Sequence, residues 1–451
     1  MTKPDLIAKY NVPGPRYTSY PTVPYWNVMQ WETDKWCSLV KTSQQNDQSK
    51  YLAIYIHLPY CDSLCTFCGC HKHITTNHDV ESRYINAVLK EWRILADSLD
   101  KDSQIHELHL GGGTPTFFDP KELKRLIEGI KLIFPFTTQA ELSFEAHPNS
   151  TSLEHLQVLN EQGFRRVSFG IQDYDPIVQQ AIHRIQTFEQ VSNCHQAAKS
   201  NGFNEISHDL VYGLPKQTLS GFKETILKTL ELKPQRVSLY SYAHVPWIKG
   251  TGQRGYSEQD LPDANLKRML YEMAKQAFVT NGYVEIGMDH FALPNDPLAL
   301  AAAEKRLHRN FMGYTPNQSS LLIGLGMSAI SECTFGFAQN EKTVTRYLEK
   351  IENGQLPITR GHQMSQSDQE IRKHILNLMC RFETELPEKT TLSRLELELQ
   401  LHDLISDGLV EWVENTIRIL PKGIPFVRNC CMAFDAYLKD QIPVKQFSMT
   451  I

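Results

Sequence analysis

Four of the ten cysteines in this chain fall within ten consecutive residues. They are Cys61, Cys65, Cys68 and Cys70, in the segment PYCDSLCTFCGC. The spacing C-x3-C-x2-C brings three thiolates onto one tight loop, which suits three corners of a cubane iron–sulfur cluster and leaves one iron open. Such clusters are normally completed by a fourth cysteine, and spacing alone does not decide whether Cys70 supplies it or stays free.

Two other uses of cysteine compete with an iron–sulfur site. Zinc also favours four cysteines, but its usual pattern is two separated C-x2-4-C pairs, whereas this loop forms one compact group. A disulfide framework is expected in secreted chains. The N-terminus carries Asp5, two early prolines and no apolar stretch of the kind found in a secretory signal. We therefore expect a cytoplasmic, reducing setting, in which both zinc and a disulfide are less favoured than an iron–sulfur cluster.

Composition excludes several classes of protein. With 451 residues, of which 41% are hydrophobic and 22% charged, the chain is an ordinary globular protein of two or three domains. A net charge of -5 argues against a general nucleic-acid binder. The most apolar run, 321–330, has ten residues, against the roughly twenty that a membrane-spanning helix needs. We expect a monomer that binds neither nucleic acid nor membrane.

The elements that must position the cysteines alternate regularly. Short β-branched runs predict strands at 51–58, 105–110, 141–145, 166–170, 206–211 and 237–242. Segments of helical periodicity between and after them predict helices at roughly 79–99, 120–133, 152–162, 175–200 and 219–232. Six strand–helix units imply a parallel sheet with right-handed crossovers. The predicted fold class is α/β, a partial (β/α)6 TIM-like barrel.

Chemistry in such a barrel gathers at the C-terminal ends of the strands. Small or polar residues stand at all six predicted ends: the cysteine cluster, Gly111-Gly112-Gly113-Thr114-Pro115, Glu145, Gln172 with Asp173, Asp209, and Ala243 with His244. We expect these residues to face one cavity.

Four parts of the chain are expected. Residues 1–50 form an N-terminal segment that covers the active site, 51–300 the barrel, and 301–364 a barrel extension and lid. Residues 365–451 predict a small, mostly helical domain whose helix, hairpin and helix resemble a winged helix. Its charge is mixed rather than basic, which favours a packing or substrate-covering role over DNA binding.

The cysteine loop, with Phe67 just before its third cysteine, resembles the radical S-adenosylmethionine motif, and Gly111 to Gly113 resemble the glycine motif of that superfamily. The resemblance narrows to the oxygen-independent coproporphyrinogen III oxidases and covers nearly the whole chain. It rests on the C-x-C ending at Cys70 and on the segments YNVPGPRYTSYPT, HLGGGTPT, SFEAHP, FGIQDYD, DLVYGLPKQT, YAHVPW, GMDHFALP, LHRNF-x-GY and FDAYLKDQ.

This resemblance implies two kinds of cofactor. Cys61, Cys65 and Cys68 would ligate a 4Fe-4S cluster whose open iron binds S-adenosylmethionine. That molecule would be contacted by Tyr55, Gly112, Glu145 and Ile330, and a second S-adenosylmethionine by Phe67, Gly113, Thr114, Gln172, Arg184, Asp209 and Ala243. Individually these residues also have structural explanations, such as a loop cap for Asp209 or a helix-surface ion pair for Arg184. Their joint placement at successive strand ends favours the cofactor interpretation.

The implied substrate is coproporphyrinogen III, a tetrapyrrole with four propionates. The resemblance implies that a 5'-deoxyadenosyl radical abstracts a propionate β-hydrogen, carbon dioxide leaves, and the remaining electron passes to an unknown acceptor, which gives a vinyl group. Two rounds yield protoporphyrinogen IX. It also implies an electron donor such as a flavodoxin or ferredoxin.

Substrate positioning is expected from Cys70, Arg16, Arg309, Phe311 and Met312, with Lys249 less secure. Arg16 could equally serve a structural salt bridge. Met312 stands where the family's HRNFQGY has Gln, so an amide is lost, and the number of bound cofactors and the tetrapyrrole used stay open. The alternatives are a haem-binding chaperone and a haem-modifying radical enzyme; Cys70 and the N-terminal segment favour the oxidase.

Overall fold

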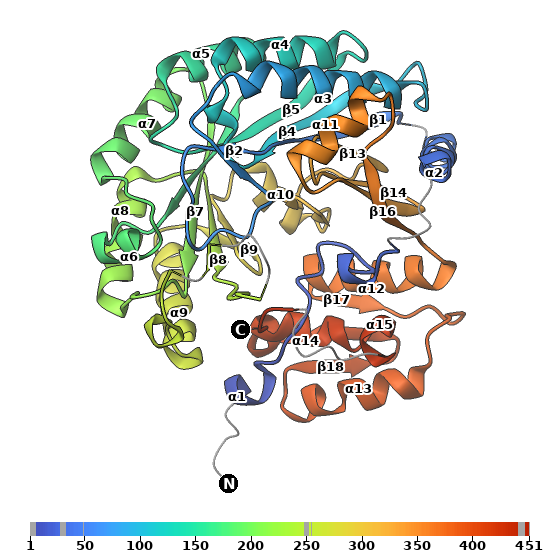
Figure 1. Ribbon diagram of the computed structural model, residues 1–451. Coiled ribbons are helices and arrows are strands. Elements are labelled where there is room, and N and C mark those ends of the chain that lie inside the picture. The colour runs from blue at the N-terminus through green and yellow to red at the C-terminus, as the bar shows by residue number, and fades with distance from the viewer. Residues whose placement is uncertain are drawn as a thin grey trace.

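The computed structural model describes residues 6–27, 33–47, 49–247, 252–253, 255–440 and 447–450. Its centre is a 12-stranded sheet with the order β16-β15-β14-β13-β1-β4-β5-β6-β7-β8-β10-β9. The seven neighbouring strands from β13 to β8 in that order run parallel. The sheet curves, and helices cover its outer side (Figure 1).

The six predicted strands coincide with the parallel strands β1 to β8 of this sheet. They are β1 (Tyr51–Leu58), β4 (Gln104–Gly112), β5 (Phe136–Ala146), β6 (Arg166–Gln172), β7 (Glu205–Tyr212) and β8 (Arg236–Ser241). The helices between them are α3 (Val80–Ala96), α4 (Pro120–Lys131), α5 (Leu153–Glu161), α6 (Pro176–Ala181), α7 (Phe188–Ser200) and, before β8, α8 (Leu219–Leu232). The predicted α/β fold, a partial barrel, is confirmed.

Amphipathic stripes attach the helices to the sheet. In α4 the buried side chains Leu123, Leu126, Ile127 and Ile130 repeat at helical spacing, and Asp119 caps the helix by accepting from the backbone of Lys121. The core that results runs between the sheet and its outer helices. Because this packing holds the strands in place, the residues at their C-terminal ends have fixed positions around the inside of the barrel.

One predicted helix, 175–200, is instead two helices. The loop 182–187 separates α6 from α7, with His183 at φ +51°. Gln186, 1% exposed, donates a hydrogen bond of 2.5 Å to the Ile171 carbonyl, and Thr187 begins α7 with a capping box. The break turns Arg184 away from a helix surface and toward the inside of the barrel.

Additional strands extend the sheet at both edges. On one side lie β13 (Leu321–Leu325), β14 (Ile330–Cys333), β15 (Gly336–Asn340) and β16 (Ile358–Gln363), and on the other β9 (Val284–Gly287) and β10 (His290–Ala292). Around them are α2 (Thr33–Gln45), α9 (Ala264–Thr280), α10 (Pro297–Ala303), α11 (Val344–Glu352), and the small pairs β2 (Tyr60–Cys61) with β3 (His73–Ile74) and β11 (His308–Asn310) with β12 (Gly313–Thr315).

The C-terminal part has its own hydrophobic core. It contains α12 (Gln366–Arg381), α13 (Arg394–Ser406), α14 (Val427–Met432), α15 (Ala436–Asp440) and a sheet of β17 (Glu383–Glu385), β18 (Val410–Val413) and β19 (Thr416–Ile419). The N-terminal segment, which begins with α1 (Leu6–Tyr10), lies beside it (Figure 1). Tyr17 of that segment donates to Asp435 at 3.0 Å. The exact domain boundaries stay a prediction.

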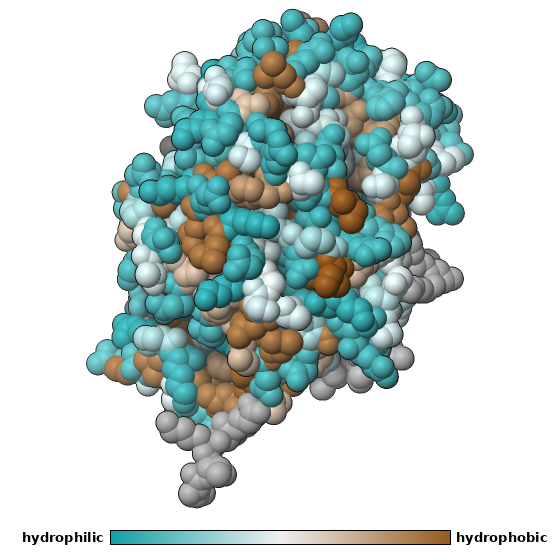
Figure 2. All heavy atoms as spheres, turned by 90° about the vertical axis from the view of Figure 1, so that its left-hand side faces the viewer, coloured by the Kyte–Doolittle hydropathy of each residue, from teal (hydrophilic) through white to brown (hydrophobic). Residues whose placement is uncertain are grey.

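The outer surface is polar over the helices. The face that carries α6 to α8 is mainly hydrophilic, with apolar side chains scattered over it (Figure 2). Exposed apolar residues of these helices include Ile177 and Leu227. In the described part of the chain, no helix has the length and apolar character that crossing a membrane requires.

Candidate active site

A cavity of about 710 Å³ lies at the C-terminal ends of the parallel strands. We call it the main cavity. Most of the predicted site residues line it, namely Arg16, Cys61, Cys65, Phe67, Cys68, Cys70, Gly112, Gly113, Thr114, Glu145, Gln172, Arg184, Asp209 and Ala243. Each of the six strand ends therefore contributes to one cavity, as expected, but Asp173 and His244 do not line it. Asp173 is instead buried, where it accepts hydrogen bonds from Gln217 and Thr225.

The three cysteines of the motif are half-buried, whereas Cys70 is exposed. Thr114 Oγ1 donates to Cys61 Sγ at 3.4 Å, and Arg184 Nη1 donates to Cys65 Sγ at 3.7 Å. A hydrogen bond with Cys70 and the charge of Lys72 lower the pKa of Cys68 to about 6, although burial opposes this. The lowered pKa favours the thiolate, which is the form that binds iron.

The donor set fits an iron–sulfur cluster. Cys61, Cys65 and Cys68 come from one loop and all line the main cavity. A cluster of several irons binds each thiolate to a different iron, and three thiols on one loop beside a cavity suit it. All ten cysteines are free of disulfides.

The glycine turn after β4 is required by close packing against β1. Gly112 has φ +118°, and a Cβ there would lie 2.8 Å from the His57 ring. A Cβ on Gly113 would lie 2.6 Å from the Pro59 carbonyl oxygen. The turn therefore leaves backbone exposed to the main cavity where any larger residue would clash.

Glu145, at the end of β5, is held by a directed chain of hydrogen bonds. Arg166 Nη2 donates to Ser143 Oγ at 3.0 Å, and Ser143 Oγ lies 2.8 Å from His109 Nδ1. Ser143 Oγ accepts from Arg166, and the other ring nitrogen of His109, Nε2, faces Glu145. That nitrogen lies 3.5 Å from Glu145 Oε1, and the Gly112 N–H donates to Oε2 at 3.1 Å.

This chain of hydrogen bonds sets the charge of Glu145. The deep position alone would raise the pKa of the carboxyl, but the hydrogen bond and charge of His109, with the Gly112 N–H, lower the pKa below its usual value. Tyr55, whose ring stacks on that of His109 with centroids 6.0 Å apart, lies next to the pair. The cavity therefore presents an ionised carboxylate.

The neighbouring strand ends, β6 and β7, carry Gln172 and Asp209, and the loop 182–187 carries Arg184. Arg184 Nη2 donates to the Gly170 carbonyl at 2.5 Å, and Gln172 has φ +68°. Burial raises the pKa of Asp209 to about 6, against the effect of the Ser168 hydroxyl, which donates to it at 2.8 Å. This part of the main cavity offers a guanidinium, an amide and a carboxyl group to a bound molecule.

Some predicted residues lie outside the lining of the main cavity. Ile330 is buried against Trp26, Phe337 and Met364. Arg309, Phe311 and Met312 are on the β11–β12 hairpin, where the Arg309 guanidinium lies 4.5 Å from the Tyr314 ring centre. Lys249 falls outside the described residues. The roles assigned to these residues stay predictions.

Sequence reasoning missed several residues that line the main cavity, among them Lys72, His147, Tyr240 and Gln253. Lys72 donates to the Cys68 carbonyl at 3.2 Å, and its nearness to the cysteines in sequence was a usable signal. Gln253 gave none, because it lies in a segment without recognisable pattern. Its amide donates to the carbonyls of Ala243 at 3.0 Å and Phe67 at 3.1 Å, and so joins β8 to the cysteine loop.

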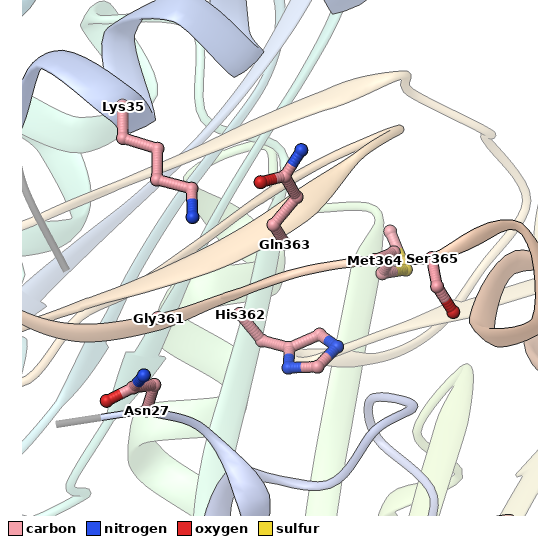
Figure 3. A pocket seen from close by; sticks show the side chains of 7 residues that line it. All are labelled: Asn27, Lys35, Gly361, His362, Gln363, Met364 and Ser365. Carbon is pink, nitrogen blue, oxygen red and sulfur yellow. The ribbon is translucent and has the colours of Figure 1, made fainter. Parts of the chain in front are cut away.

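Another hollow, of about 430 Å³, lies where α2 faces β16. Lys35 reaches toward β16 from one side, and Asn27 lies on the other (Figure 3). His362 Nε2 in this hollow lies 3.1 Å from Asp368. Of the residues that line it, none is a cysteine or a predicted site residue. The main cavity is therefore the candidate site.

Comparisons with known proteins agree with this choice. Residues 55–228, which include the cysteine loop, match the radical SAM superfamily. The chain is 37% identical to oxygen-independent coproporphyrinogen III oxidase from Salmonella typhimurium, over 99% of this chain and 98% of that one. It is also 37% identical to the protein of the same name from Helicobacter pylori, over 99% of both.

A solved structure, that of coproporphyrinogen III oxidase from Escherichia coli, is described as a radical SAM enzyme. It is similar to this structure with a TM-score of 0.88 and 35% identity, and the match covers 94% of this chain and 98% of that one. The similarity therefore extends through the C-terminal part as well as the barrel.

Proposed function

The chain belongs to the family of oxygen-independent coproporphyrinogen III oxidases, and from this premise we propose that its main cavity is the reaction chamber. The reaction is the oxidative decarboxylation of two propionate side chains of coproporphyrinogen III to vinyl groups, without oxygen, to give protoporphyrinogen IX. The names of the relatives favour this activity over a haem-binding chaperone or a haem-modifying enzyme. The observation that carries the proposal is the convergence of three motif thiols and six strand ends on one cavity.

The cofactors of the family are a 4Fe-4S cluster and S-adenosylmethionine, which together supply a 5'-deoxyadenosyl radical when bound. Cys61, Cys65 and Cys68 would hold the cluster. The proposal is supported by the lowered pKa of Cys68 and by the cations Lys72 and Arg184 beside the loop, which offset the negative charge of bound thiolates.

The main cavity has matching groups for S-adenosylmethionine. We assign Tyr55, Gly112, Glu145 and Ile330 to the molecule on the cluster. The ionised Glu145 carboxylate suits an ammonium group, and the glycine turn allows close approach of the backbone.

We also propose that the main cavity binds a second S-adenosylmethionine. It would be bound by Phe67, Gly113, Thr114, Gln172, Arg184, Asp209 and Ala243. The Arg184 guanidinium suits a carboxylate, and the Asp209 carboxyl and Gln172 amide suit ribose hydroxyls. All seven residues line the main cavity, which supports the assignment.

Substrate positioning is proposed for Cys70, Arg16, Arg309, Phe311 and Met312. Support differs among them, because Arg16 and Cys70 line the main cavity and the hairpin residues do not. Residues 1–50 would cover the chamber, and 301–364 would extend the barrel formed by 51–300. The C-terminal domain, 365–451, would pack against the barrel or cover the substrate. The chain would act as a cytoplasmic monomer, reduced by a donor such as flavodoxin or ferredoxin.

An anaerobic assay tests the function. Reconstituted protein with dithionite, S-adenosylmethionine and coproporphyrinogen III should form 5'-deoxyadenosine and vinyl product together. Cys65→Ser should abolish both, whereas Cys37→Ser, which changes a half-buried cysteine of α2, should abolish neither. Formation of 5'-deoxyadenosine without vinyl product would overturn the proposed substrate.

A further inference from the structure

A smaller pocket lies beside the main cavity, where β8, α9, the N-terminal segment and α14 meet. Its volume is about 50 Å³, and it is lined by Arg16, Ser241, Arg268, Lys275, Asp289 and Arg428 among others. We call it the side pocket. Arg16 and Ser241 line both the side pocket and the main cavity, so they form a wall common to the two.

The side pocket carries an excess of positive charge. Two of its cations have carboxylate partners: Lys275 Nζ lies 2.6 Å from Glu285, and Arg268 pairs with Glu272. Within the described chain, neither Arg16 nor Arg428 has a carboxylate at salt-bridge distance. Asp289 is the one further acid that lines the pocket.

Neutral carbonyl groups hold these two arginines. Arg16 Nη2 donates to the Ser241 carbonyl at 2.6 Å. Arg428 Nε donates to Pro15 at 2.8 Å, Nη1 to Met449 at 3.1 Å, and Nη2 to Gly14. Carbonyls satisfy the N–H donors but carry no charge, so Asp289 is the acid in the pocket that offsets part of the charge of Arg428, which is only 5% exposed.

A third cation adds to this field. Lys267 of α9 donates to the Tyr242 carbonyl at 3.2 Å. Burial, followed by the charges of Arg16 and Arg428, lowers the pKa of Lys267 to about 8. Burial and the charge of Arg16 likewise lower the pKa of Arg428 to about 9. The three cations therefore repel one another, and Asp289 offsets only part of their charge. Lys267 does not itself line the side pocket, but its charge would add to the attraction that Arg16 and Arg428 exert on an anion there.

We propose that the side pocket binds one propionate of the tetrapyrrole, a carboxylate that stays unreacted while another propionate lies in the main cavity. This inference rests on the proposed function. A pocket of about 50 Å³ has room for a carboxylate group, since a cavity of roughly 10–15 Å³ in the same measure already holds a water. Arginine pairs with carboxylates through parallel hydrogen bonds, which would fix the orientation of the ring system.

Binding of coproporphyrin III, the oxidised tetracarboxylic acid that is not turned over, tests this role. Reconstituted anaerobic protein is titrated by fluorescence with coproporphyrin III and with its uncharged tetra-amide. Arg16→Gln and Lys267→Gln each retain a donor for their carbonyl partner but lose the charge. Each should weaken binding of the acid about tenfold, and of the tetra-amide far less.

Two controls separate charge from folding. Arg83→Gln removes a surface charge that pairs with Glu352 at 2.6 Å and lines neither pocket, and this variant should bind both probes like the wild type. Arg428 is not substituted, because its three carbonyl partners join the two ends of the chain. Added salt should weaken acid binding less in Arg16→Gln than in the wild type.

Each outcome has a distinct meaning. Unchanged affinity for the acid in both variants overturns the inference and leaves the proposed function intact. Equal weakening of acid and tetra-amide also overturns it, since only a structural role would explain that result. If inorganic phosphate competes fully with coproporphyrin III while free propionate does not compete, the inference is overturned, because the pocket then takes phosphate instead of a carboxylate. If the wild type binds coproporphyrin III but does not convert coproporphyrinogen III, the proposed function fails and the inference does not.

Discussion

Two carboxyl groups deep in the fold, Glu145 at the strand ends and Glu91 between α3 and β13–β15, have opposite environments. Glu91 is 1% exposed and accepts hydrogen bonds from the Gly326 N–H, Tyr347 Oη and Asn340 Nδ2 at 2.8, 2.7 and 2.6 Å. All three donors are neutral, and burial raises its pKa to about 7. Beside Glu145, by contrast, His109 helps to lower the pKa, and 43% of the Glu145 side chain is open to the main cavity.

The comparison separates a structural acid from a binding acid. Each accepts several hydrogen bonds, so their number does not distinguish the two. What differs is the charge of the neighbours and the empty space beside the carboxylate. Glu91 joins strands to a helix, whereas Glu145 is an ionised group that a cationic ligand can reach.

The largest expected effect is on activity at the strand ends. Glu145→Gln should lower kcat/KM about 100-fold or more, because a charge that would hold an ammonium group is lost. The thermal midpoint should change little. Anaerobic kinetics measure kcat/KM, and calorimetric titration measures the binding of S-adenosylmethionine. Glu141→Gln, four residues earlier on the same strand, is the control, and equal losses in both variants would contradict the assignment.

The next effect is on stability in the core. Glu91→Ala should lower the free energy of unfolding by about 3 kcal/mol or more, because three buried donors lose their acceptor and a cavity is left. Activity per folded molecule should be retained. Urea unfolding and active-site titration check this, and a fall in activity without a fall in stability would place Glu91 in the functional site instead.

The pH dependence of stability sharpens the same contrast. The pKa of Glu91 is raised from an ordinary 4.5 to about 7 in the folded protein. Its contribution to the free energy of unfolding is therefore full below pH 4.5 and is lost as pH rises toward 7. At 1.36 kcal/mol per pKa unit this is about 3 kcal/mol. The wild type should lose about that much relative to Glu91→Gln across this range. Parallel unfolding profiles of the two proteins would refute the raised pKa.

The smallest effect is expected at His109, which acts through Glu145. His109→Ala should weaken S-adenosylmethionine binding about fivefold to tenfold and raise the pKa of Glu145, which moves the acid limb of the kcat/KM profile to higher pH. His109→Gln keeps an N–H donor and should recover part of the affinity. If both variants lose the same affinity for S-adenosylmethionine and neither shifts the pH profile, His109 has only a packing role.

Much of the barrel was predictable because local patterns carry it. Buried β-branched runs gave the six parallel strands, and polar residues after them gave most of the main cavity. The break at 182–187 was not predictable, since it depends on Gln186 bonding to carbonyls of β6, a partner set by the fold. Arg184 consequently reaches Cys65 instead of a helix surface.

The neighbours of Glu145 and the side pocket were also beyond sequence reasoning. Nothing in the order of residues shows that His109 bonds to Ser143 of the adjacent strand through one ring nitrogen and faces Glu145 with the other. Lys267 and Arg428 lie far apart in the chain and carried no motif. Their proximity to Arg16 appears only where the N-terminal segment meets α9 and α14.

The sequence by itself determined the ligand chemistry and the order of the elements, because thiol spacing and hydrophobic periodicity are local properties of the chain. Only the tertiary structure decided which acid is charged, which arginine faces the cysteines and where cations gather. Those properties depend on distance, burial and neighbouring charge, and folding sets all three by bringing remote residues together.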